Sequence, residues 1–289
     1  IRKYMLGYKA KTEIGLRLKE IEEKIKDLQK KKYAHKEINE LLIERNRAIK
    51  GINEKLVNES PLIGSTLIKS QLYPLKYVKF DTVFIDECSQ ASISLALLGM
   101  LKGKKCILVG DHKQLLPIFR TVKEKVLQEK YSAFSYLLNQ YPERSVWLKY
   151  HYRSNAEIIG FSQQRFYENK IKPAKRCYGL KLDINGWQSL DRGKILSPDK
   201  PVVFVHVEGK ESYEGNSKYN EKEAKVCSEI VKNLMGCGLR PTEIGIITPY
   251  RMQRAVIKEK VGKEIEVNTV DAFQGRQKDV IIYLSLIHI

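Results

Sequence analysis

Residues 82–92 read TVFIDECSQAS, in which three apolar residues run directly into two adjacent acids, Asp86 and Glu87. A second run of the same form follows at 105–111, KCILVGD, and closes on Asp111. Continuous runs rich in β-branched residues are typical of strands that are buried on both faces of a parallel sheet. The pattern therefore predicts an α/β fold in which these three acids lie at the carboxyl ends of strands, where such sheets bind ligands.

Beyond residue 60, short apolar runs of this kind alternate with stretches whose apolar residues have helical spacing. Further strands are expected at 201–207, 243–250 and 279–286, and helices at 122–139, 155–168 and 220–235. This alternation favours parallel sheets with helices on both faces. With 289 residues, of which 43% are hydrophobic, the chain is long enough for two domains, each with its own core.

Residues 1–57 differ in kind, since their apolar residues repeat at alternating intervals of three and four, which predicts helices. The register slips across KKKYAHK at 30–36, which favours two helices folded back as an antiparallel hairpin over one long rod. The apolar positions are Ile14, Leu18, Ile21, Ile25 and Leu28 in the first helix, and Ile38, Leu42, Ile49, Ile52 and Leu56 in the second.

The charge balance points to a polyanionic partner. The chain has 52 Lys and Arg against 34 Asp and Glu, a net charge of +18, which attracts nucleic acid or phosphate ligands. Its five cysteines form no CxxC pair, which fits reduced thiols in an intracellular protein. The longest apolar run, 93–101, is far shorter than the ~20 residues that cross a bilayer, so no membrane association is expected.

The paired acids at 86 and 87 have a chemical interpretation and a structural one. Two neighbouring carboxylates repel each other unless a cation or a reaction uses them. In nucleoside-triphosphatases an acid at such a strand end helps to hold Mg²⁺, and another residue can align the attacking water. The alternative is an acidic helix start, which the helix dipole favours. The second strand supports the chemical interpretation, because Gly110 allows a tight turn and the neutral amide of Gln114 could sense a γ-phosphate.

Five ordered motifs resemble those of the Upf-like and senataxin-like superfamily 1 helicases, which are ATP-driven motors on single-stranded RNA or DNA. They cover about 200 residues, so chance similarity is a poor explanation. The motifs are DECSQ (86–90), GDHKQLLP (110–117), LKYHYRSN (148–155), IGIITPYRMQ (244–253) and VNTVDAFQGRQKDVII (267–282).

The resemblance implies two RecA-like parallel-sheet domains, both incomplete, with ATP in the cleft between them. Residues 1–57 would be a helical hairpin inserted into the first domain, 58–121 the carboxyl-terminal part of that domain, and 122–289 the truncated second domain. The family's phosphate loop, GxxxxGK followed by Ser or Thr, does not occur in this sequence. We therefore expect the loop to lie in a part of the protein that precedes Ile1.

The resemblance also assigns residues to the nucleotide. Asp86 would hold Mg²⁺, Glu87 would be the catalytic base, and Gln114 would contact the γ-phosphate. Arg153 would be an arginine finger, Tyr152 would pack on the adenine, and the backbone at Gly275 would approach a phosphate. Gly110, Asp111 and Gln277 complete the expected nucleotide contacts. His151 and Gln277 stand where the family usually has Gln and Glu, which alters the contacts expected at both places.

A second set of residues matches segments that contact the backbone of a single strand in this family. Hydroxyls, backbone amides and an aromatic ring suit binding that ignores base identity, although each threonine could equally be an ordinary turn or cap residue. The set is Thr66, Thr248, Pro249, Tyr250 and Thr269. We expect a monomeric, intracellular ATP-dependent helicase. The alternative is a non-catalytic nucleic-acid-binding protein derived from such a motor.

Overall fold

The computed structural model describes residues 15–30, 34–190, 195–215 and 217–285. The first fourteen residues of the predicted hairpin, Ile14 among them, and the last four residues of the chain lie outside this description. The chain forms two compact units, 1–145 and 146–289, and each is described by itself.

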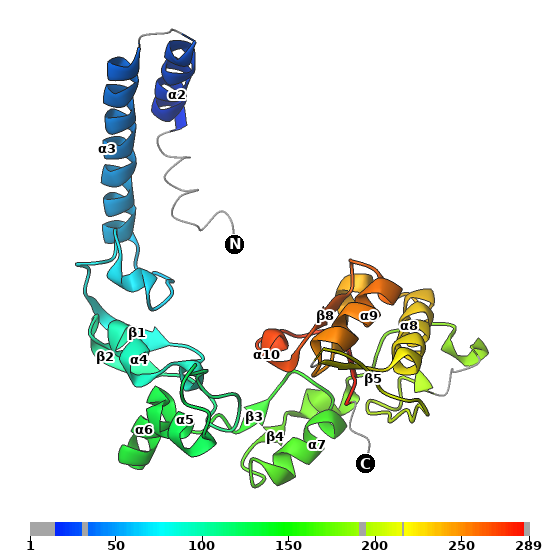
Figure 1. Ribbon diagram of the computed structural model, residues 1–289. Coiled ribbons are helices and arrows are strands. Elements are labelled where there is room, and N and C mark those ends of the chain that lie inside the picture. Colours follow the sequence, from blue (N-terminus) through cyan, green and yellow to red (C-terminus); the bar gives the residue numbers. More distant parts are fainter. Residues whose placement is uncertain (1–14, 31–33, 191–194, 216, 286–289) are drawn as a thin grey trace. The chain divides into compact units, whose positions relative to one another are not determined.

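The first unit contains the sheet predicted from the two acid-tipped strands. Strand β1 (Phe80–Ile85) pairs in parallel with β2 (Gly103–Leu108), with Ile85 opposite Leu108. Helix α4 (Ile93–Met100) connects the strands and contacts both of them (Figure 1). Burial of Ile85 and Ala96 forms the centre of this core. The prediction of parallel strands ending at Asp86 and near Asp111 is confirmed.

The helical stretch predicted at 122–139 is two helices, α5 (Lys125–Tyr131) and α6 (Ala133–Gln140). The break falls at Ser132, whose side chain accepts a hydrogen bond from the Ser135 amide and caps α6. Ser132 also donates to the Ser89 carbonyl at 2.9 Å. Because α6 also contacts α4 and the turn at Ser89, residues 122–145 pack with the first unit. The compact units consequently divide after residue 145, whereas the motifs placed the boundary at 121/122.

Two further helices precede this sheet. Helix α2 (Gly15–Gln29) packs along α3 (His35–Glu59), and Leu18, Ile21 and Ile25 are buried, as the apolar spacing predicts (Figure 1). An ion pair between Arg45 and Glu22, 3.0 Å apart, and another between Arg17 and Glu44, 3.1 Å apart, join the two helices. The short helical turn η2 (Lys69–Gln71) follows before β1.

The second unit has a three-stranded parallel sheet in the order β8–β7–β9. Strand β7 (Ile244–Ile247) lies between β8 (Glu266–Asn268) and β9 (Val280–Tyr283), and Ile244 and Ile246 are completely buried. Helices α8 (Glu221–Gly236) and α9 (Arg251–Val261) pack against each other (Figure 1). The strands predicted at 243–250 and 279–286 and the helix at 220–235 are therefore present.

Smaller elements complete this unit. Strands β3 (Tyr150–His151) and β4 (Lys172–Pro173) pair in parallel, and α7 (Ala156–Arg165) lies between them in the chain. Strands β5 (Ser212–Glu214) and β6 (Ser217–Tyr219) are antiparallel, and α10 (Val270–Phe273) follows β8. Short helical turns occupy Cys88–Gln90 (η3), Pro142–Arg144 (η4), Lys175–Gly179 (η5), Trp187–Ser189 (η6) and Pro241–Glu243 (η8).

The strand predicted at 201–207 is wrong. All seven residues are described and none is in a strand, and Val202 and Phe204 are 61% and 87% exposed. An apolar, β-branched run becomes a strand only where a neighbouring strand pairs with it. The prediction was based on composition, which does not show whether such a partner exists. In the described part of the chain no helix is both long and apolar enough to span a bilayer.

Candidate functional site

The two adjacent acids occupy a tight turn at the carboxyl end of β1. Glu87 has a left-handed backbone, with φ 51° and ψ 35°. Residues other than glycine rarely adopt this conformation, and those that do are frequently found at functional sites. The Asp86 carboxylate accepts a hydrogen bond from the Glu87 amide at 3.0 Å, and the Gln90 side chain donates to the Glu87 carboxylate at 3.1 Å. Both carboxylates are exposed, so a ligand can reach them.

The second turn, at the end of β2, is organised by Asp111. Its carboxylate accepts from the Lys113 amide at 2.9 Å and from the Gln114 side chain at 2.8 Å, and the Gln114 amide donates to the Asp111 carbonyl at 3.1 Å. The Gln114 side chain is exposed and held over the turn. The Asp111 carboxylate therefore fixes the side chain of Gln114.

The two turns are bonded to each other. The Cys88 amide donates to the Val109 carbonyl at 2.8 Å, and the Asp111 amide donates to the Ser89 hydroxyl at 3.4 Å. Ser89 is completely buried, and its contact with the second turn cannot be inferred from its place in the DECSQ motif. The structure thus brings together Asp86, Glu87, Gly110, Asp111 and Gln114 at one edge of the sheet.

Gly110 makes this close approach possible. A Cβ atom at residue 110 would lie 2.9 Å from the Ser89 nitrogen and 3.1 Å from the Phe134 ring. We predict that Gly110→Ala lowers the free energy of unfolding by about 1–3 kcal/mol, the usual cost of overpacking, as measured by urea denaturation. Gly160→Ala is the control, because its Cβ would meet nothing within 4 Å and alanine favours the helix. Equal stabilities of the two variants would contradict the packing role.

The thiol beside the acids is not reactive. Burial raises the pKa of Cys88 to about 11, so the group stays protonated near neutral pH. Among the described residues no three His, Cys, Asp or Glu side chains gather as a metal cage. Exposed Asp86 fits Mg²⁺ nonetheless, since that ion is usually held by one or two carboxylates together with substrate phosphates.

Tyr152 and Arg153 belong to the second unit and follow β3 directly. Arg176 fixes the tyrosine: its guanidinium donates to the Tyr152 carbonyl at 2.8 Å and lies 5.2 Å from the ring centroid. Arg153 is exposed, and the next turn is closed by Asn155, which accepts from the Glu157 amide at 2.9 Å and caps α7. Preceding them, His151 is half-buried, and desolvation lowers its pKa, which favours the neutral imidazole.

The predicted strand-binding residues of this unit gather at the carboxyl ends of β7 and β8. The Thr248 amide donates to the Asn268 carbonyl at 3.1 Å, which places Thr248 beside the segment that leads into Thr269. Thr248 is completely buried, Pro249 is exposed, and Tyr250 and Thr269 are half-buried. Pro249 is therefore the member of this set that is openly accessible.

The remaining predicted residues are Gly275 and Gln277 in the second unit and Thr66 in the first. Gly275 has φ 75°, and its Cβ position faces open space, so its backbone is accessible; neighbouring Gln277 is also exposed. Thr66 is an exposed residue of the first unit, and its hydroxyl accepts from the Lys69 amide at 3.3 Å. The amino acids predicted to contact the nucleotide thus fall into one group at the β1–β2 edge and another in the second unit.

Known proteins provide an independent comparison. Two family models, each described as an AAA domain, match residues 8–122 and 129–288. An uncharacterized ATP-dependent helicase of Methanocaldococcus jannaschii is 36% identical over 82% of this chain and 38% of its own length. The DNA replication ATP-dependent helicase/nuclease of Xenopus laevis is 31% identical over 85% of the chain and 26% of its own length.

A third relative is the regulator of nonsense transcripts 1 of Dictyostelium discoideum, which is 34% identical over 78% of the chain and 17% of its own length. The chain therefore spans well under half the length of these three relatives.

Proposed function

The chain belongs to the Upf-like superfamily 1 helicases, and from that premise we propose that the whole protein hydrolyses ATP to move along single-stranded RNA or DNA. The observation that carries the proposal is the cluster at the β1–β2 edge. Two exposed carboxylates and Gln114 are held there by hydrogen bonds within their turns, and a bond from Asp111 to Ser89 joins the two turns. ATPase assays of the full-length protein, with and without a single strand, test it. Absence of strand-stimulated hydrolysis would refute it.

Within this proposal each residue of the first unit has a task. Asp86 would hold Mg²⁺ with the phosphates of ATP, and the ion would neutralise phosphate charge. Glu87 would accept a proton from the attacking water, and its exposed carboxylate is suited to reach one. Gln114, fixed by Asp111, would donate its amide to the γ-phosphate.

The second unit would supply the remaining nucleotide contacts. Arg153 would place its planar guanidinium on the transferring phosphoryl group, where five donors match phosphate geometry. Tyr152, held by Arg176, would stack on the adenine. The open backbone at Gly275 would approach a phosphate, and Gln277 would bind beside it without adding charge.

The domain organisation forms part of the proposal. Residues 58–121 and 122–289 would be parts of two RecA-like domains, and helices α2 and α3 would be an insertion in the first. We propose a monomer in a reducing, intracellular compartment, which is supported by five free cysteines. The helicase names of the relatives favour a motor over a non-catalytic binding protein.

Single-strand binding should depend strongly on salt. If basic residues neutralise several backbone phosphates, the logarithm of the affinity falls linearly with the logarithm of the salt concentration, by about 0.7 per phosphate contact. We expect a steep slope because the chain carries a net charge of +18. Fluorescence anisotropy with a labelled oligonucleotide at several salt concentrations measures it. A flat response would contradict phosphate-directed binding.

A further inference from the structure

We propose that Gln253 is a positioning residue that fixes the segment Thr248–Tyr250 for binding to a single strand. The inference rests on the proposed function and on the family resemblance, which implies that this segment contacts the single strand. Gln253 is completely buried at the start of α9 and cannot itself contact a strand. Any influence on binding must therefore be indirect.

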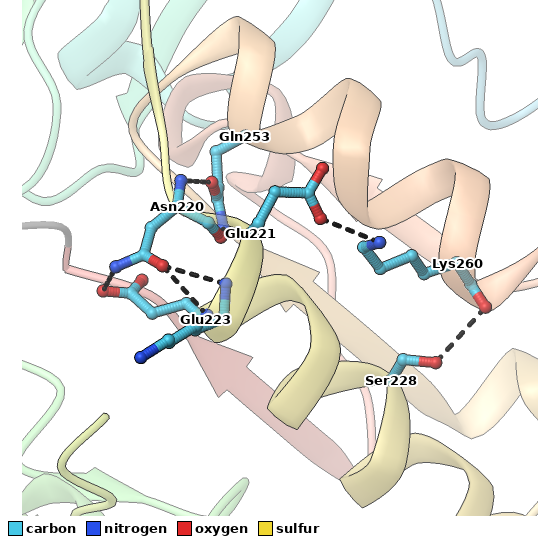
Figure 2. A network of polar contacts seen from close by, with 7 residues as sticks. Asn220, Glu221, Glu223, Ser228, Gln253 and Lys260 are labelled. Atoms are coloured by element: carbon cyan, nitrogen blue, oxygen red, sulfur yellow. Dashed lines mark hydrogen bonds and ion pairs between the residues drawn. The ribbon is translucent and has the colours of Figure 1, made fainter. Parts of the chain in front are cut away.

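The oxygen and the nitrogen of the Gln253 carboxamide both form hydrogen bonds with the main chain of Asn220. The oxygen accepts from the Asn220 amide at 2.6 Å, and the nitrogen donates to the Asn220 carbonyl at 3.2 Å. Figure 2 shows the Gln253 side chain lying against the main chain of Asn220, whose own side chain points toward Glu223 at the start of α8. The carboxamide can make both bonds because it donates and accepts. The Asn220 carbonyl also accepts from the Ala224 amide at 3.1 Å, so Gln253 matters most to the buried Asn220 amide.

A second bond joins the same two segments. The Met252 amide donates to the Ser217 hydroxyl at 3.0 Å, so consecutive residues of α9 are tied to the two ends of 217–220. Tyr250 precedes α9 and provides no side-chain cap for it, so Ser217 satisfies one of the unpaired amides of the first turn. The beginning of α9 is thus held from outside the helix.

Asn220 is a firm anchor for these bonds. Its side-chain oxygen accepts from the Lys222 and Glu223 amides at 3.0 and 3.2 Å and caps α8. Gly209 lies so close that a Cβ there would stand 2.8 Å from the same oxygen. Because Asn220 is only 1% exposed and packed on several sides, it cannot shift to follow Gln253.

Thr248–Tyr250 is consequently fixed at both ends. At its start, Thr248 is bonded to Asn268 of the sheet; immediately after its end, Met252 and Gln253 are bonded to 217–220. Loss of the Gln253 bonds would leave the bond from Met252 to Ser217 as the remaining hydrogen bond between the start of α9 and residues 217–220 among those described here. A contact segment that is held loosely binds less tightly, because binding must then order it.

The test is Gln253→Met in the full-length protein, which keeps the side-chain length but removes both hydrogen bonds. Two control variants disturb the same helix pair. Ile257→Val removes one methyl group from the buried face of α9, and Ser228→Ala removes a bond from the Ser228 hydroxyl to the Lys260 carbonyl, 3.3 Å long (Figure 2). We expect Gln253→Met to weaken binding of a single-stranded oligonucleotide about tenfold, the order of the cost of ordering one or two side chains on binding. The measurement is made at a temperature where all three variants are folded.

Hydrogen exchange provides a readout that does not depend on nucleic acid. Without ligand, Gln253→Met should speed exchange of the Thr248 and Met252 amides, whereas Ile257→Val and Ser228→Ala should leave them as in the wild type. Unchanged exchange, or binding losses that simply follow melting temperature across the three variants, would overturn the positioning role. If the wild type binds no single strand, the proposed function fails, and the exchange result still decides whether Gln253 holds the segment.

Discussion

Arg153→Ala is expected to lower the rate of ATP hydrolysis by the full-length protein on the order of 10³-fold, the smallest effect usual for loss of an arginine finger. The residue is exposed directly after β3 and is not part of a core, so the fold should survive the change. Single-turnover hydrolysis with saturating single strand measures the rate, and circular dichroism verifies folding.

Arg153→Lys separates charge from shape. Lysine keeps the positive charge but lacks the planar fork that binds two phosphate oxygens at once, so we expect it to restore little of the rate. Arg165→Lys, a change at an exposed position in α7, is the control and should hydrolyse ATP like the wild type. Near-normal turnover of Arg153→Ala would remove this residue from the mechanism.

Glu87→Gln is expected to slow hydrolysis about 10²-fold or more while ATP binding stays nearly intact, because glutamine cannot take a proton from water. Glutamine has the same size and can still accept the hydrogen bond from Gln90, so the turn should keep its form. Turnover and the dissociation constant of a fluorescent ATP analogue should be measured together. Glu129→Gln, at an exposed position in α5, is the matched control. Unchanged turnover of Glu87→Gln would show that another group is the base.

The sequence predicted the parts of the fold whose patterns are local. Parallel strands at β1, β2, β7 and β9 follow from continuous apolar runs, and the carboxyl-end position of Asp86 follows from where the first run stops. The helices α2 and α3 follow from their apolar spacing. Each of these features depends on residues that are close in the sequence, which is why they could be inferred.

Features that depend on distant partners were missed. The break at Ser132 goes with bonds from Ser132 and Ala133 to Ser89 and Ala91, more than 40 residues away. The run at 201–207 has strand composition but no strand, since pairing is decided elsewhere in the chain. The complete burial of Thr248 likewise depends on the packing of the second unit rather than on its own motif.

The left-handed backbone of Glu87 sets thermal stability against the proposed catalytic role of its carboxylate. Glycine occupies this conformation without steric cost, whereas another residue there carries on the order of 1 kcal/mol of strain. A selection that rewards thermostability alone would therefore drift toward glycine at position 87 and discard the carboxylate. Thermostable variants of this protein should be assayed for ATP hydrolysis after every round of selection. A single substitution of Glu87 by glycine would raise thermal stability and remove the proposed catalytic base together.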